Sequence, residues 1–208
     1  MTNVTKIDSK NITLSQQVGI FVDAYYNDND FQLAFGGDTG VRKFHLYIIF
    51  LYFCSYNKLF GYPSETIREN DDIVGLINYN NKNPLTCTIK DIRRYKFFHF
   101  CYNHLLNPKI RYRIDKYSKC ANSMTNNLMT YDLIQIGIRK KAQGKGYIRE
   151  LIQALEIKAT TDDKVNGLTV STYSKKKCEL YESLGFKLNQ YIEDLETRVW
   201  TLIRELSA

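Results

Sequence analysis

One segment in the last third of the chain constrains the fold more than any other, because it joins a strand, a glycine turn and a helix. Residues 128–138 are rich in apolar and β-branched side chains, which predicts a buried strand. Gln143-Gly-Lys-Gly146 follows, and its two glycines allow a left-handed backbone or the close approach of another group. We therefore predict a strand that enters a tight turn at residues 143–146 and continues into a helix.

The helix after the turn is predicted from the spacing of its apolar residues. They recur at intervals that place them on one helical face: Ile148, Leu151, Ile152, Leu155 and Ala159. A helix N-terminus presents unpaired N–H groups and the positive end of the helix dipole. Because the glycine turn leads directly into that N-terminus, the segment predicts a phosphate site there.

Length and composition indicate an ordinary globular protein. The chain has 208 residues, 44% hydrophobic and 25% charged, which we interpret as a single domain over residues 1–208. The formal net charge of +7 favours anionic ligands, but the basic residues are dispersed and no nucleic-acid-binding motif is present, so nucleic acid is not the expected partner. The N-terminus lacks a signal-peptide core, and the most apolar run, residues 44–54, is too short to span a bilayer. We expect no membrane association.

The cysteines and histidines give no metal-ligand pattern. The cysteines are widely spaced and form no Cys-x-x-Cys pair: Cys54, Cys87, Cys101, Cys120 and Cys178. This spacing supports neither a zinc site nor a disulfide framework. We therefore predict no metal site and a reduced, cytoplasmic location.

The other segments alternate between strand and helix patterns. The expected order is a strand within residues 3–14, helices over 15–26 and 38–56, strands over 59–67 and 73–79, the strand and helix described above, a strand over 168–173, a helix over 174–184, and a hairpin of 187–195 with 197–204. Ser15 and Asp38 are the expected N-caps, and Gly185 the expected stop. Residues 80–127 contain a helical pattern over 89–106 and are interpreted as a helical insertion before the central strand.

This order predicts an α/β fold with a mixed, partly antiparallel sheet and flanking helices. The strands over 128–138 and 168–173 are joined by a helix, so they should form a parallel pair with a right-handed crossover.

Two motifs together resemble a known family. Gln143-Gly-Lys-Gly-Tyr-Ile148 looks like the Gln/Arg-x-x-Gly-x-Gly/Ala turn of the GNAT-type acyl-CoA N-acetyltransferase superfamily. The run Ser174-Lys-Lys-Lys-Cys-Glu-Leu-Tyr-Glu-Ser-Leu-Gly-Phe186 resembles its second signature, Asn-x-x-Ala-x-x-Leu-Tyr-x-x-Leu-Gly-Phe. The motifs lie in the family's order and at its usual separation. The resemblance covers residues 128–186 and implies a GNAT-like sheet with a central splayed strand pair.

The resemblance also implies an activity, which is the transfer of an acetyl group from acetyl-CoA to an amine in a ternary complex. The turn would hold the pyrophosphate of coenzyme A through Gln143, Gly144, Lys145, Gly146, Tyr147 and Ile148. The backbone near Ile136 and Ile138, with Ser174, would contact the pantetheine arm. Arg139, Lys140, Lys141 and Lys145 would meet the phosphates. Tyr181 matches the family tyrosine that acts as general acid and would protonate the leaving thiolate.

Ile148, Ser174 and the lack of an identifiable general base keep a second hypothesis open, and the sequence departs from the family pattern at three positions. Ile148 stands where the family has Gly or Ala, Ser174 replaces Asn, and Lys177 replaces Ala. The alternative is a catalytically degenerate GNAT module that binds acyl-CoA or a protein partner without turnover. The general base is left open among four side chains and a water chain: Asp30, Asp38, His45 and Asp132.

A narrower resemblance links Asp23-Ala-Tyr-Tyr-Asn-Asp-Asn-Asp-Phe31 and the Gln-Gly-Lys-Gly turn to the puromycin-type acetyltransferase subgroup. The central strand departs from that subgroup at residues 130–133, and no antibiotic substrate is carried over. The acceptor is expected to be a small-molecule or peptide amine. The sequence leaves its identity, the acyl chain length and the choice between monomer and homodimer open.

Two charged segments are interpreted as structural. Lys175 to Lys177 is expected to be a solvated helix start rather than a phosphate clamp. Residues 93–102 are expected to form a helix that buries Phe97, Phe98 and Tyr102 under a basic outer face.

Overall fold

The computed structural model describes residues 5–8, 12–28, 32, 39–81, 88–125, 128–193 and 198–206. Its strands are β1 (Thr5–Asp8), β2 (Ser64–Glu69), β3 (Asp72–Asn80), β4 (Thr130–Ile138), β5 (Gly167–Thr172), β6 (Lys187–Glu193) and β7 (Arg198–Glu205). They form one seven-stranded sheet in the order β1-β2-β3-β4-β5-β7-β6. The pair β4–β5 is parallel and the other pairs of described strands are antiparallel. The predicted mixed, partly antiparallel sheet is confirmed.

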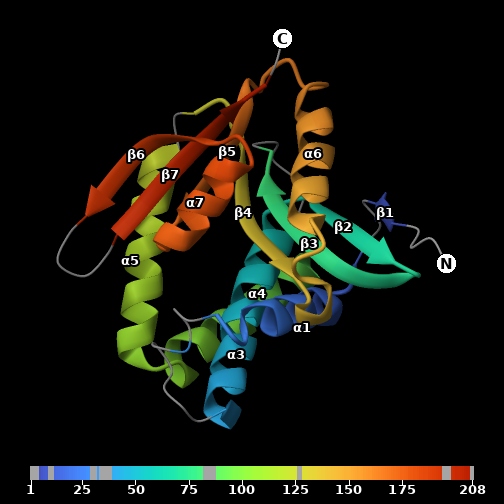
Figure 1. Cartoon of the computed structure of the whole chain (residues 1–208). Coiled ribbons are helices and arrows are strands. Elements are labelled where there is room, and N and C mark those ends of the chain that lie inside the picture. Colours follow the sequence, from blue (N-terminus) through green and yellow to red (C-terminus); the bar gives the residue numbers. More distant parts are fainter. Residues whose placement is uncertain are drawn as a thin grey trace.

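Helices flank this sheet (Figure 1). They are α1 (Leu14–Tyr25), α3 (Thr39–Leu59), α4 (Ile89–Leu105), α5 (Pro108–Thr125), the 3-10 turn η1 (Lys140–Ala142), α6 (Tyr147–Ala159) and α7 (Lys175–Ser183). Consecutive side chains of a strand point to opposite faces. Accordingly, Ile136 and Ile138 of β4 lie in one apolar core with α6 and α7. Gly137 faces α1 on the other side, where an added Cβ would lie 2.8 Å from the Phe21 ring.

The helix α1 therefore packs directly on β4, on the face opposite α6 and α7. Phe21 belongs to a second apolar core that α1 shares with α3 and α4. The two faces of β4 thus pack against different helices. Because Gly137 has no side chain, α1 can pack directly against the β4 backbone at this residue.

Two predicted boundaries in the first third are wrong. Thr13, not Ser15, caps α1, because the Thr13 side chain accepts from the Gln16 amide while the Gln16 side chain accepts from the Thr13 amide. The helix α3 continues to Leu59, so the following strand begins only at Ser64 rather than at residue 59. The expected cap Asp38 lies outside the described residues.

Residues 80–127 form two helices where the sequence indicated one. The predicted helix is α4, and α5 follows it with Pro108 as its first residue. The two are linked by the Tyr102 hydroxyl, which donates to Asp115 at 2.9 Å. Tyr102 is buried as expected, but Phe97 is 60% exposed, so the expectation that it is buried is wrong. The limits of a single domain and of its insertion stay a prediction.

No helix in the described ranges is long and apolar enough to cross a membrane. Within the same ranges, no group of three or more His, Cys, Asp or Glu is arranged to hold a metal ion.

Candidate active site where strands β4 and β5 separate

The parallel pairing of the two central strands ends before the strands do. It runs from Thr130–Gly167 to Leu133–Val170, although β4 continues to Ile138. At the same place β4 contains a β-bulge, because Asn78 is opposite Gln135 while the next residue, Tyr79, is opposite Leu133. A bulge bends its strand and disrupts the local pairing. We call the region in which β4 residues 134–138 and β5 residues 171–172 have separated the splay.

The backbone of β4 directs polar groups into the splay. The Arg139 amide donates to the Val74 carbonyl of β3 at 2.8 Å. In an antiparallel ladder, hydrogen-bonded pairs alternate with non-hydrogen-bonded ones, so Gly137 bonds toward β3 while Ile136 and Ile138 point their N–H and C=O groups away from it. The two residues named from the sequence for the pantetheine arm therefore face the splay.

Side chains from other elements donate hydrogen bonds to the carbonyl groups of Ile136 and Ile138 that face the splay. The Tyr25 hydroxyl donates to the Ile136 carbonyl at 2.7 Å. The Gln143 side-chain amide donates to the Ile138 carbonyl at 3.0 Å and to the Ala24 carbonyl at 3.3 Å. Gln143 thus links the glycine turn to the end of β4 and to α1.

The glycine turn has the predicted form. Gly144 and Gly146 have φ angles of 81° and 86°, in the left-handed region that glycine adopts without a steric cost. A Cβ added to either glycine would meet no atom within 4 Å, so open space borders both. Gly146 is the N-cap of α6 and contributes no side-chain cap hydrogen bond. The first-turn amides of α6 and the adjacent space together make a cradle suited to phosphate groups.

The remaining turn residues are placed by packing. Tyr147 is buried, and Ile148 is half-buried and packs against the core under α6. The Ile148 side chain is therefore directed at the core. This explains how a bulky residue is accommodated at a position where the family has Gly or Ala.

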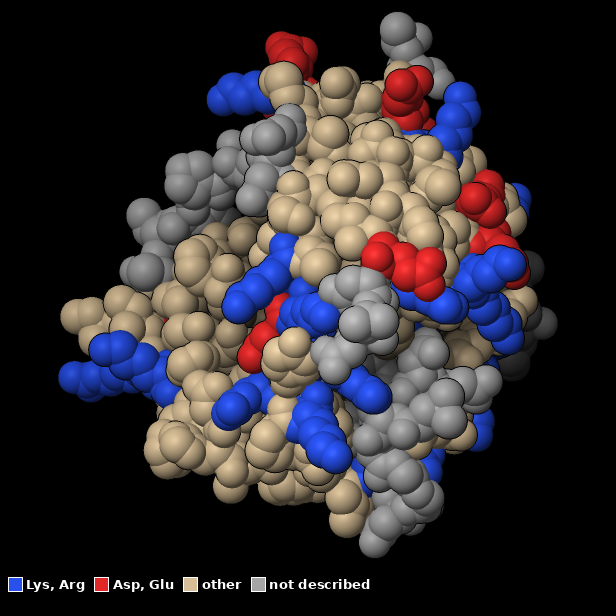
Figure 2. Space-filling model, turned by 90° about the vertical axis from the view of Figure 1, so that its left-hand side faces the viewer, with Lys and Arg blue, Asp and Glu red and all other residues tan. Residues whose placement is uncertain are grey.

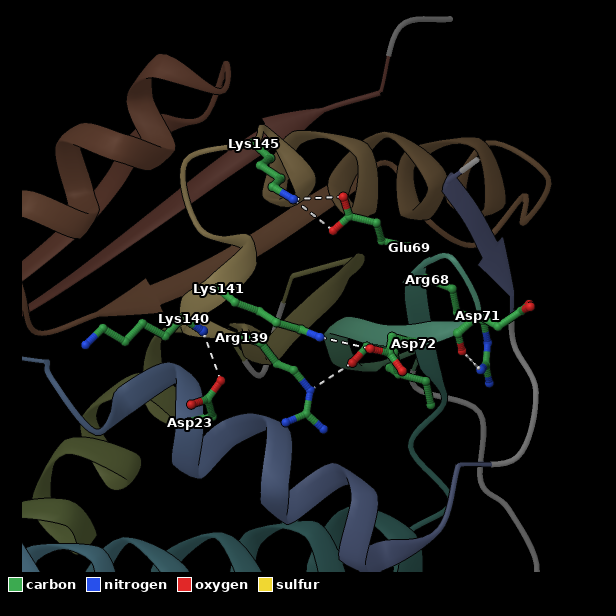
Figure 3. Close-up of polar contacts among 10 residues, drawn as sticks. Asp23, Arg68, Glu69, Asp71, Asp72, Arg139, Lys140, Lys141 and Lys145 are labelled. Carbon is green, nitrogen blue, oxygen red and sulfur yellow. Dashed lines mark hydrogen bonds and ion pairs between the residues drawn. The ribbon is translucent and has the colours of Figure 1, made fainter. Parts of the chain in front are cut away.

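The basic residues of this region contact carboxylates of the β2–β3 hairpin (Figure 3). Lys145 pairs with Glu69 at 2.8 Å, and Lys141 pairs with Asp72 at 2.9 Å. The hydrogen bond from Lys145 lowers the pKa of Glu69, and the same bond raises the pKa of Lys145. The Lys141–Asp72 pair is exposed and contributes little stability, so exchanging its carboxylate for a phosphate is energetically accessible.

An open cleft lies beside these pairs. It has a volume of about 1410 Å³ and lies between α1, α3, the β2–β3 turn and η1. Its lining includes Asp23, Asp72, Arg139, Lys140 and Lys141. Asp23 also accepts a hydrogen bond from the Lys140 backbone amide at 3.0 Å. The cleft therefore carries both signs of charge.

Tyr181 lies on α7, in the core on the α6 side of the sheet. Its ring meets the Phe186 ring edge-on, with centroids 5.7 Å apart. Burial, and after it the proximity of Tyr25, raises the pKa of the Tyr181 hydroxyl. Tyr181 thus stays protonated at neutral pH, the state that a proton donor requires.

Ser174 is the N-cap residue of α7, but its side chain makes no cap hydrogen bond. Its backbone amide donates to the Thr172 hydroxyl at 3.2 Å. Ser174 therefore lies at the end of β5, beside the splay, and its contact with the pantetheine arm stays a prediction.

Sequence reasoning missed a group of side chains that meet at the open end of the splay. Lys177 of α7 pairs with Asp28 at 2.7 Å, and its ammonium lies 5.0 Å from the Tyr25 ring centroid and 5.2 Å from that of Tyr173. Lys175 and Lys176 are exposed, as expected of a solvated helix start, but for Lys177 that expectation is wrong. The available signal was the lysine at a position where the family has alanine.

The insertion also reaches this region. The Tyr117 hydroxyl of α5 donates to the Ser171 carbonyl of β5 at 2.8 Å, and its ring meets the Tyr173 ring edge-on at 5.2 Å. Burial raises the pKa of Tyr117, and the nearby Tyr181 and Tyr25 add to the effect. Tyrosines from α1, α5 and α7 thus surround the splay.

The candidates for the general base are distributed over several elements. Asp132 lies in the paired part of β4 and accepts from the Thr130 hydroxyl at 3.1 Å. Burial, Tyr56 and then Asp132 raise the pKa of Tyr62 to about 12. Burial lowers the pKa of His45 on α3, which favours its neutral form. Asp30 and Asp38 lie outside the described residues.

The basic side chains are dispersed on the face that can be seen (Figure 2), as their positions in the sequence indicate. Figure 2 shows Lys and Arg side chains in separate groups among other residues on one face. No unbroken basic stripe crosses the described residues of that face.

Comparison with known proteins finds a family model that matches about one third of the chain. Residues 120–186 match the model of the acetyltransferase (GNAT) family. The GNAT resemblance is confirmed. The matched segment contains the splay, the glycine turn, α6, β5 and α7. This match supports acyl transfer in general terms, and no curated protein sequence matches the chain significantly.

Solved structures share the fold at low sequence identity. A histone acetyltransferase HPA2 and related acetyltransferase from Corynebacterium glutamicum is 14% identical with a TM-score of 0.60, over 98% of this chain and 97% of that one. The ribosomal-protein-S18-alanine N-acetyltransferase from Escherichia coli is 14% identical with a TM-score of 0.54, over 99% and 96%. The protein yncA from Salmonella typhimurium, solved with its cofactor acetyl-CoA, is 15% identical with a TM-score of 0.50, over 99% of this chain and 95% of that one. At these identities the likeness shows the GNAT fold alone.

Proposed function

We propose that this GNAT protein transfers an acetyl group from acetyl-CoA to a primary amine by direct attack in a ternary complex. One observation carries the proposal. The splay-facing carbonyls of β4 are linked to both other parts of the candidate site: Gln143 of the glycine turn donates to Ile138, and Tyr25, which donates to Ile136, is near enough to Tyr181 to affect its pKa. These contacts connect a phosphate site, a strand edge for an amide-containing arm and a proton donor.

The described residues fit coenzyme A. The amides at Gly144–Ile148 and the open space at both glycines suit its pyrophosphate. Lys145 and Lys141 are close enough to the turn to exchange their carboxylate partners for phosphate. The backbone of Ile136 and Ile138 presents alternating donors and acceptors to the pantetheine amides, as an additional strand would. When bound, acetyl-CoA supplies the thioester carbonyl that the amine attacks.

Tyr181 is assigned the role of general acid. Its phenol is protonated at neutral pH and so holds a proton for the sulfur that departs, although the same burial that raises its pKa lowers its acidity. An amide N–H of the splay-facing β4 residues would stabilise the negative charge that develops on the carbonyl oxygen. Because the amine and the thioester are held together, the reaction needs no covalent enzyme intermediate.

Calorimetric titration with acetyl-CoA, followed by release of free thiol in the presence of amines, tests the proposal. We expect saturable binding of acetyl-CoA and thiol release that depends on an added amine. The panel should contain polyamines, aminoglycosides, amino acids and peptides. Absence of saturation at millimolar acetyl-CoA would exclude the proposed activity.

A second candidate is a degenerate GNAT module that binds acyl-CoA or a protein partner without turnover. It is favoured by the side chains that already engage the splay: Tyr25 on the Ile136 carbonyl, Gln143 on the Ile138 carbonyl, and Lys177 at the open end. The same experiment separates the two candidates, because the degenerate module would bind acetyl-CoA and release no thiol with any amine in the panel.

A further inference from the structure

Lys177 connects the two faces of the sheet at the open end of the splay. It belongs to α7, whose Cys178 and Tyr181 lie in the core on the α6 side. Its partner Asp28 follows α1, which packs on the opposite face of β4. Lys177 therefore crosses from one face to the other close to Tyr181, which is one helical turn further along α7.

The site that receives the Lys177 ammonium has the chemistry of a cation cage. The Tyr25 and Tyr173 rings lie 5.0 Å and 5.2 Å from the nitrogen, within the range at which an aromatic ring attracts a cation. The Asp28 carboxylate lies 2.7 Å from it and supplies the opposite charge. The three groups come from different elements, so the fold assembles the cage.

Both tyrosines of the cage are held by contacts with other elements, and the site is partly open to solvent beside Lys177. Tyr25 is fixed by its hydrogen bond to Ile136, and the Tyr173 ring is fixed by edge-on contact with Tyr117. The Asp28 side chain is 14% exposed, whereas the Lys177 side chain is 28% exposed. Solvent therefore reaches the site along the lysine side chain, and another ammonium group could enter by the same path.

We propose that this cage, formed by Tyr25, Asp28 and Tyr173, binds an alkylammonium group of the acceptor, and that Lys177 is an internal occupant which the acceptor displaces. The proposal rests on the proposed function, because it names the acceptor class of that same site. The class is an amine that carries a protonated, unbranched alkylammonium chain, such as a diamine or a lysine side chain. Lys177 competes with a free amine for the cage at an effective concentration of roughly millimolar or higher. In the wild type, an amine with a single ammonium group and weak affinity should therefore fail to displace Lys177.

The first test measures binding without acyl-CoA. Lys177→Ala removes three methylene groups and the ammonium group from the side chain. Free n-propylammonium has three carbons and the same charge, so it can replace the deleted group. We expect n-propylammonium, titrated by NMR, to bind Lys177→Ala about tenfold more tightly than the wild type, since the cation–π and ion-pair contacts become available to it. Lys176→Ala, which changes the exposed neighbouring lysine, should behave as the wild type.

Two controls define the chemistry of the cage. In the Lys177→Ala background, Asp28→Asn should weaken n-propylammonium binding by about tenfold, because the carboxylate charge is lost. Uncharged n-propanol, a ligand of the same size, should not bind. Equal n-propylammonium affinity in the wild type, Lys176→Ala and Lys177→Ala would overturn the proposal, as would binding that is insensitive to Asp28→Asn.

The second test connects the cage to the acceptor. With saturating acetyl-CoA, Asp28→Asn should raise KM for 1,5-diaminopentane about tenfold and leave KM for benzylamine, which lacks a second ammonium group, within twofold. Equal changes for both amines would overturn the role in acceptor binding. If no amine is acetylated but n-propylammonium binds as expected, the proposed function fails while the cage stands. If amines are acetylated and their KM does not depend on Asp28, the cage proposal fails while the proposed function stands.

Discussion

The hydroxyl of Tyr25 donates to the carbonyl oxygen of Ile136 at 2.7 Å and so joins the last residue of α1 to the strand edge at the splay. Its two preceding neighbours make similar links. Asp23 accepts from the Lys140 amide at 3.0 Å, and the Ala24 carbonyl accepts from Gln143 at 3.3 Å. The final turn of α1 is thereby fixed to both β4 and the glycine turn. Because α1 and the proposed coenzyme A site share these contacts, a change in one should be transmitted to the other.

Tyr25→Phe tests this link. The substitution keeps the ring but leaves the Ile136 carbonyl without its tyrosine donor, so we expect the free energy of unfolding to fall by about 1 kcal/mol. Acetyl-CoA affinity should be unchanged or higher, because that carbonyl becomes available to the pantetheine arm. Urea denaturation and calorimetry measure the two effects, with the exposed Tyr112→Phe as control. A tenfold loss of affinity with an intact fold would mean that the hydroxyl aligns β4 for binding.

Tyr181→Phe tests the general acid. The phenol proton is lost while the ring keeps its contact with Phe186, so kcat should fall by roughly ten- to a thousand-fold with little change in acetyl-CoA affinity. Tyr191→Phe, on the exposed strand β6, should leave kcat unchanged. Single-turnover kinetics and calorimetry provide the two measurements. An unchanged kcat for Tyr181→Phe would make Tyr181 a purely structural residue.

The raised pKa of Tyr181 predicts a pH dependence. Burial favours the neutral phenol, so its ionisation in the folded protein occurs above the ordinary value of about 10. Ionisation of Tyr181 should therefore cause no loss of kcat between about pH 7 and pH 9. An alkaline decrease in that range that is present in the wild type and absent from the residual activity of Tyr181→Phe would contradict the assignment.

The same shift affects stability with a definite sign. Above about pH 10 the unfolded chain releases the Tyr181 proton while the folded protein retains it, so stability falls as pH rises. Below about pH 10 the contribution of the neutral Tyr181 phenol to the free energy of unfolding is fully present. Denaturation of the wild type and Tyr181→Phe at neutral and alkaline pH should show a smaller alkaline loss for the variant.

The segment from β4 to α7 could be predicted from sequence because its signals are local. Glycines at 144 and 146 mark backbone that only glycine adopts easily, and apolar spacing defines the buried face of α6. The helix α5 was missed for an equally local reason. Its residues are mostly polar and basic, and it begins at Pro108, a residue that interrupts a helix interior but is favoured at the first position of a helix.

The contacts that complete the candidate site could not be predicted in the same way. Tyr25 and Ile136, Tyr117 and Ser171, and Asp28 and Lys177 are each distant in sequence, and no periodicity links the partners. The β4 bulge is similarly defined by pairing with β3 rather than by the β4 sequence. Only the packing of α1 and α5 on the sheet brings these groups together.

Ile148→Ala separates packing from ligand binding. Ile148 is half-buried against the α6 core, so truncation should lower the free energy of unfolding by about 1–2 kcal/mol. Acetyl-CoA affinity should be unchanged or higher, because the side chain is directed away from the cradle and a smaller residue matches the family pattern. Ile157→Ala on the same helix is the matched control, since Ile157 is 68% exposed and should have little effect. A large loss of affinity with an intact fold would show that this turn is used differently.

Gly146→Ala tests the phosphate cradle itself. Gly146 has a φ of 86°, so an alanine there should cost about 1–2 kcal/mol of stability. Its Cβ would also enter the open space beside the α6 amides, and we expect acetyl-CoA affinity to fall at least about tenfold, as after the loss of one charge-assisted hydrogen bond.

Gly19→Ala provides the control for this last prediction. An added Cβ at Gly19 also meets no atom within 4 Å, but this glycine lies within the helix α1, where alanine should stabilise by about 0.5–1 kcal/mol. Thermal unfolding and calorimetric titration of the two variants compare the same added methyl group in two backbone settings. Equal acetyl-CoA affinity in Gly146→Ala and Gly19→Ala would mean that the pyrophosphate does not approach the turn at Gly146. A selective loss in Gly146→Ala would locate the ligand at the N-terminus of α6.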